Sequence, residues 1–106
     1  MEQLTTSELK EKISNGENLV LDFYATWCGP CKIMLNNLEM ANDSLVKESG
    51  GDPKFSFYKF DVDSDMNFAV EMGVRSVPTI KVFKNGVESY SKSGVISSLE
   101  IIKLLN

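Results

Sequence analysis

The sequence contains no histidine, only two cysteines and three prolines, and its apolar runs are too short to span a bilayer. The lack of histidine excludes Ser-His-Asp and Cys-His nucleophile systems, imidazole acid–base catalysis and histidine-ligated metals. Two cysteines without a second pair also argue against a four-ligand zinc site. We therefore expect no bound metal.

Positive charge is scarce as well. Lys and Arg total 11 against 15 Asp and Glu, which gives a net charge of −4. A nucleic-acid binder normally needs a cationic face that displaces phosphate counterions, so we expect no nucleic-acid partner. The N-terminal residues do not resemble a secretory signal, and the C-terminal residues match no lipidation signal. These features predict a cytoplasmic protein without a membrane partner. The cytoplasm is reducing, so a permanent structural disulfide is disfavoured there.

The rest of the composition is that of an ordinary globular domain. Of the 106 residues, 42% are hydrophobic and 25% are charged, which predicts one domain over residues 1–106. Capping boxes start at Thr5 and Ser97, and Asn85-Gly86 marks a tight hairpin. The periodicity predicts helices over about 5–15, 31–49, 68–72 and 97–105, and strands over 19–25, 55–62, 77–83 and 87–90. This order indicates an α/β protein with three α/β/α layers, in which four helices flank a central mixed sheet of four to five strands.

The two cysteines lie three residues apart, between an apolar strand and the long helix. Gly29 allows a sharp turn out of the strand, and Pro30 suits the first helical turn. Residues at this spacing on a helix have Cβ atoms about 5–6 Å apart, so a disulfide can close and reopen without refolding. The helix dipole favours a thiolate at Cys28, the predicted nucleophile, while Cys31 lies deeper in the helix as the resolving thiol. A structural disulfide, a zinc site or a chance pair fits this setting less well.

These residues resemble a known family, the thioredoxins, over essentially the whole chain. Asp22–Lys32 is similar to the family's active-site stretch, with Trp-Cys-Gly-Pro-Cys at its centre. Arg75–Thr79 resembles its cis-proline loop and Phe83–Gly86 its hairpin. Lys59 and Gly94 also stand where the family has them. The resemblance implies the thioredoxin fold and a thiol–disulfide oxidoreductase that reduces disulfides in proteins.

The resemblance also implies roles for two charged residues of the strands. Asp22 matches the family's buried acid beneath the cysteines, where burial raises the pKa of a carboxyl and lets it accept the proton of Cys31. Lys59 matches the lysine near that acid. From the residues alone, a solvent-exposed Asp22 and a solvated Lys59 stay open.

A substrate surface is implied in the same way. Pro78 matches the cis-proline, and the backbone of Val77 is expected to pair with an extended substrate segment. The expected apolar patch consists of Trp27, Gly29, Pro30, Val77, Pro78 and Gly94. Without the resemblance, Pro78 reads as an ordinary trans proline and Trp27 as a core residue.

The predicted function follows from these assignments. We expect no bound cofactor besides the reversible Cys28–Cys31 disulfide, and electrons from NADPH through a thioredoxin reductase. The expected partners of this monomer are that reductase and disulfide-containing proteins. The alternative is a thioredoxin-fold binding or regulatory subunit that uses the apolar patch without redox turnover. Two residues depart from the family pattern: Asn36 replaces a helix-kinking proline, and Ser93 replaces an apolar residue.

Overall fold

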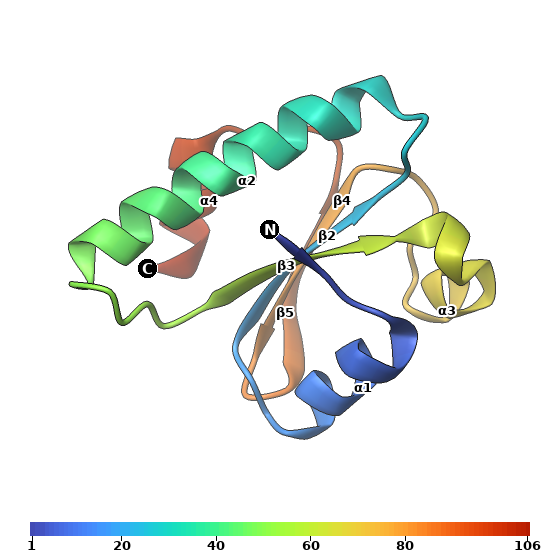
Figure 1. The fold of residues 1–106 in the computed structure, drawn as a ribbon, viewed down its shortest axis with the longest axis horizontal. Coiled ribbons are helices and arrows are strands. Elements are labelled where there is room, and N and C mark those ends of the chain that lie inside the picture. The colour runs from blue at the N-terminus through green and yellow to red at the C-terminus, as the bar shows by residue number, and fades with distance from the viewer.

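The computed structural model describes all 106 residues, which form five strands, four α-helices and one 3-10 turn. In chain order these are β1 (Glu2–Gln3), α1 (Thr6–Ser14), β2 (Leu19–Tyr24), α2 (Gly29–Glu48), β3 (Ser56–Asp61), η1 (Val62–Ser64), α3 (Met66–Glu71), β4 (Thr79–Lys84), β5 (Val87–Ser93) and α4 (Ser98–Leu105). Figure 1 shows α2 and α4 on one side of the sheet, and α1 and α3 on the other. The predicted three-layer α/β/α class is confirmed.

The sheet is mixed, with strand order β1-β3-β2-β4-β5. The strands β1, β3 and β2 run parallel, whereas β4 is antiparallel to both β2 and β5. The first five residues of the central strand, Leu19–Phe23, are all buried. This explains why its sequence is almost continuously apolar, since a strand covered on both faces has no polar side.

Two apolar clusters fill the spaces between the sheet and its helices. One lies beneath α2 and α4 and contains Val20, Met34, Leu38, Ala41, Phe55, Phe57, Ile80, Val82, Ile96, Ile101 and Leu105. The other lies beneath α1 and α3 and contains Leu4, Leu9, Leu19, Leu21, Phe23, Phe60, Phe68, Ala69, Val74 and Phe83. Because strand side chains alternate between faces, Asp22 points to the α2 side together with Val20.

Local sequence signals predicted the order of the main helices and strands, but two short elements and several element boundaries differ from the prediction. The capping box at Thr5 forms as predicted. At Ser97 only half of the box forms, because the side chain of Glu100 binds Lys92 instead of turning back to the cap. The short strand β1 and the turn η1 were not predicted, and β4 starts at Thr79 rather than at Val77. None of the helices combines the length and the apolar character that crossing a membrane requires.

The long helix α2 starts earlier than predicted and runs without interruption for 20 residues. Its first residue is Gly29, directly after the N-cap residue Cys28. Asn36, which stands in place of a proline, keeps its backbone N–H and donates a side-chain hydrogen bond toward Met40 Sδ at 3.7 Å. The helix therefore reaches the site as one continuous element.

Candidate active site

The Cys28–Cys31 pair forms a disulfide across the first turn of α2. The Cα atoms are 5.3 Å apart, a normal separation for a disulfide. Cys28 has an extended backbone as the N-cap residue, and its Sγ accepts a hydrogen bond from the N–H of Cys31 at 3.2 Å. Pro30 stands in the first helical turn, where its missing N–H leaves no helical bond unmade. The local sequence thus places Cys28 at the positive end of the helix.

Both sulfur-bearing residues are buried in this oxidised state. Cys28 is 5% exposed and Cys31 is 3% exposed, so the predicted contrast in accessibility is small here. Ala25 completes the buried part of this cluster, and the partly buried Val62 and Val77 pack against it. Gly29 and Pro30, between the cysteines, are exposed. The disulfide therefore lies directly below the protein surface.

Asp22 on β2 is a fully buried acid, with 0% of the residue exposed. Neither carboxylate oxygen has a hydrogen-bond partner. Burial raises the pKa of Asp22 to about 7, while the positive charge of Lys59 acts in the opposite direction. At neutral pH this carboxyl can therefore either accept or release a proton.

Lys59 is the register partner of Asp22 on the neighbouring strand β3. Its side chain is half-buried, and the ammonium lies 5.3 Å from the ring centroid of Tyr24. This is a cation–π contact, which partly replaces the lost hydration of the charge. Lys59 therefore acts on Asp22 through space rather than through an ion pair.

The loop before β4 brings distant residues to the cysteines. The Val77–Pro78 peptide bond is cis, Pro78 is buried and Val77 is partly buried. The N–H of Gly94 donates to the carbonyl of Pro78 at 2.8 Å, which joins this loop to the end of β5. The N–H and C=O of Val77 make no hydrogen bond within the chain's loops. They are available to pair with an extended polypeptide.

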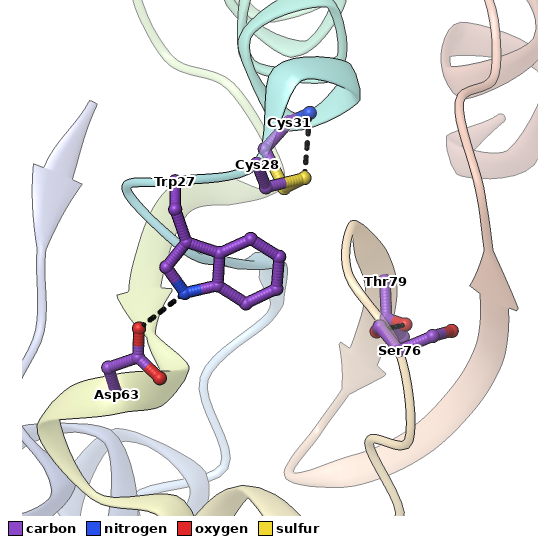
Figure 2. Close-up of a disulfide and its surroundings, with 6 residues drawn as sticks. All are labelled: Trp27, Cys28, Cys31, Asp63, Ser76 and Thr79. Carbon is purple, nitrogen blue, oxygen red and sulfur yellow. Dashed lines mark hydrogen bonds between the residues drawn. A yellow bond between two sulfur atoms is a disulfide. The ribbon is translucent and has the colours of Figure 1, made fainter.

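Trp27 is 71% exposed and does not belong to the core. Its Nε1–H donates to Oδ2 of Asp63 in η1 at 2.8 Å, and Figure 2 shows the indole held in this direction beside the cysteine pair. An apolar groove of about 730 Å³ extends from the indole along α3. Its lining includes Met66, Val70, Arg75 and Val77.

Sequence reasoning missed the contributions of Asp63 and of α3 to this surface. The acidic residues Asp61, Asp63 and Asp65 at the end of β3 and after it could have indicated a partner for Trp27. Their spacing alone does not show which of them accepts the hydrogen bond of the indole. No group of three or more Cys, Asp or Glu side chains is placed to hold a metal ion. The structure thus shows a disulfide, an exposed indole with an apolar groove beside it, and a buried carboxyl on β2.

Comparison with known proteins agrees with this geometry. The family model described as Thioredoxin matches residues 1–106. A thioredoxin of Malassezia sympodialis is 42% identical over 79 residues, which cover 74% of this chain and 70% of that protein. A thioredoxin of Rickettsia felis is 35% identical over 104 residues, which cover 97% of this chain and 93% of that protein. The crystal structure of oxidised mitochondrial thioredoxin 3 from Saccharomyces cerevisiae has a TM-score of 0.78 at 32% identity, covering 99% of this chain and 92% of that one.

Proposed function

The chain belongs to the thioredoxin family and is a thiol–disulfide oxidoreductase, and we propose that it acts, as one domain over residues 1–106, as a reductase of protein disulfides. The observation that carries this proposal is the Cys28–Cys31 disulfide at the start of α2, against which Val77 packs. Only Gly29 and Pro30 separate the cysteines. A histidine there would stabilise the thiolate further and make the disulfide more oxidising, so its absence supports a reducing role.

Cys28 is the nucleophile of the reduced protein in this proposal. Its N-cap position supports this role, because unpaired N–H groups and the helix dipole stabilise a thiolate there. The thiolate attacks one sulfur of the substrate disulfide and forms a bond between Cys28 Sγ and that sulfur. The other substrate sulfur leaves as a thiolate and takes a proton from solvent.

Cys31 resolves this mixed disulfide. Asp22 accepts the proton of the Cys31 thiol, a role supported by its burial and by its pKa of about 7. The new thiolate attacks Cys28 Sγ, and the second substrate sulfur leaves. Two electrons have then passed from the protein dithiol to the substrate disulfide, and the Cys28–Cys31 bond remains. Lys59 tunes the step by lowering the pKa of Asp22.

The substrate segment binds in an extended form against the loop before β4. The free N–H and C=O of Val77 support this geometry, because they can add the segment as a short strand. The apolar surface around the disulfide would accept the neighbouring side chains. Its proposed members are Trp27, Gly29, Pro30, Val77 and Gly94, together with Pro78, which is itself buried.

Each turnover leaves the disulfide oxidised, so the cycle needs an external reductant. We assign this role to a thioredoxin reductase supplied with electrons by NADPH, with no cofactor bound to the chain itself. A disulfide that must be returned to the dithiol state suits the reducing cytoplasm. A monomer leaves the substrate surface open.

The test is the reduction of insulin by dithiothreitol, followed by the precipitation of the insulin chains. We expect the protein to accelerate precipitation and the double variant Cys28→Ser/Cys31→Ser to match the uncatalysed rate. NADPH oxidation in the presence of a thioredoxin reductase then tests the electron source. The alternative of a binding subunit is not favoured. Failure of the unmodified protein to accelerate precipitation would support that alternative instead.

A further inference from the structure

A hydroxyl chain joins the end of β5 to the loop before β4. Thr79 Oγ1 donates to the carbonyl of Ser76 at 2.7 Å, and it also lies 3.2 Å from Ser93 Oγ. Figure 2 shows the first of these bonds, within the loop that faces the cysteine pair. A threonine hydroxyl has one hydrogen, which here goes to Ser76, so the hydrogen between the two hydroxyls must come from Ser93. The chain therefore runs from Ser93 to Thr79 to the Ser76 carbonyl.

This hydroxyl chain and one backbone hydrogen bond hold two carbonyls of the loop, that of Ser76 and that of Pro78. The carbonyl of Ser76 precedes Val77 and is fixed by Thr79. The carbonyl of Pro78 follows it and accepts the N–H of Gly94. Both carbonyls are thereby connected to the end of β5, one through Ser93, its last residue, and the other through Gly94, which follows it. The Ser76–Val77 peptide, which carries the free N–H of Val77, is thus connected through Thr79 to Ser93 on β5.

Ser93 is the residue at the solvent-exposed start of this hydroxyl chain. Thr79 is 3% exposed, whereas Ser93 lies at the exposed end of β5, and the two residues are register partners. An apolar side chain at position 93 would remove the donor to Thr79 Oγ1. The hydrogen bond from Thr79 to Ser76 would then lose the polarisation that a chain of hydrogen bonds provides.

We propose that Ser93 is a positioning residue for polypeptide substrates, which acts through Thr79 and Ser76 on the backbone of Val77. This inference rests on the proposed function. It distinguishes two kinds of disulfide. A polypeptide substrate uses the Val77 backbone and depends on Ser93, whereas a small disulfide without a peptide backbone needs only the cysteines.

The experiment measures the second-order rate of oxidation of the reduced protein by insulin and by bis(hydroxyethyl) disulfide, using the fluorescence of the single tryptophan, Trp27, as the signal. We expect Ser93→Ala to react about 3- to 10-fold more slowly with insulin, the range expected for one hydrogen bond, and at the parent rate with the small disulfide. Ser93→Thr, which restores the hydroxyl, should recover the parent rate with insulin. The control is Ser91→Ala on the same strand, whose hydroxyl accepts from Lys81 instead, and it should match the parent with both substrates.

Three results would overturn the proposal. These are an unchanged insulin rate in Ser93→Ala, an equal loss with both disulfides, and an equal loss in Ser91→Ala. If the parent protein reduces neither disulfide, the proposed function itself fails. Parent activity on both substrates with a loss confined to insulin and to Ser93→Ala supports both conclusions.

Discussion

Asp22 and Lys59 are register partners on β2 and β3, yet no ion pair joins them. The ammonium of Lys59 lies over the ring of Tyr24, and the carboxylate of Asp22 has no hydrogen-bond partner. An ion pair would lower the pKa of the acid strongly and make it a poor proton acceptor. The observed arrangement leaves the pKa of Asp22 at about 7, with Lys59 as a moderate opposing influence.

The first prediction concerns the pH dependence of the resolving step. Only ionised Asp22 can accept the proton of Cys31, so the rate should rise as pH increases through about 7 and then level off. Asp22→Asn should slow this step by at least about 10-fold and abolish the rise. Lys59→Met should move the midpoint to higher pH, because the charge that lowers the pKa of Asp22 is removed. Stopped-flow release of substrate from the mixed disulfide measures the step.

Asp43→Asn, which removes an exposed carboxyl on α2, serves as the control and should keep the parent profile. The pH range from about 6 to about 9 extends from about one unit below the expected midpoint to about two units above it. A parent rate that stays constant over this range contradicts the role of Asp22. A midpoint that moves to lower pH in Lys59→Met contradicts the role of Lys59.

The second prediction concerns stability. The folded-state pKa of Asp22, about 7, lies above its ordinary value of 3.8, so between these values the folded protein holds a proton that the unfolded chain releases. The protonated Asp22 therefore contributes to the unfolding free energy. This contribution is fully present below the pKa of Asp22 in the unfolded chain, and it is lost as pH rises through its pKa in the folded protein. Relative to Asp22→Asn, the parent should lose about 1.4 kcal/mol of unfolding free energy per pH unit over this range. Urea denaturation of both oxidised proteins measures the difference, and a constant difference across the range would disprove it.

The third prediction separates the two cysteines. Cys31→Ser should attack a substrate disulfide through Cys28 and remain linked to it, because the resolving thiol is missing. Cys28→Ser should trap no substrate, because its remaining thiol is not the attacking group. Mass spectrometry without reductant detects the added mass of the trapped substrate. If Cys28→Ser forms the adduct and Cys31→Ser does not, the two roles are reversed.

The fourth prediction uses two glycines with similar backbone angles. Gly50 has φ +67° and Gly86 has φ +78°, so alanine is strained at both, by about 1–2 kcal/mol. A Cβ at Gly50 would meet nothing within 4 Å, whereas a Cβ at Gly86 would lie 2.5 Å from the carbonyl oxygen of Ile13. Gly86→Ala should therefore lose a further 1–3 kcal/mol of unfolding free energy, roughly the cost of overpacking. Urea denaturation of the two variants compares them, and equal losses would show that the contact with α1 can relax.

Several features of the protein were predictable from local sequence. The capping residues, the Asn85-Gly86 turn and the continuous apolar strand each depend on neighbouring residues, so their signals lie within a few positions. The cysteine pair belongs to the same class, because the first turn of a helix fixes the separation of residues three apart. The strand β1 was not predicted, because its two residues are too few to show an alternating pattern. It forms only by pairing with β3, which is distant in the sequence.

The sequence by itself determined the order of the elements and the chemistry of the cysteine pair, since both arise from short-range geometry and residue type. Only the tertiary structure decided which groups surround that pair. Trp27 meets Asp63 across 36 positions, and Ser93 meets Thr79 across 14. Such contacts depend on how strands align and loops approach in space, and the alternation of residues along each strand does not specify which side chains on different elements finally meet.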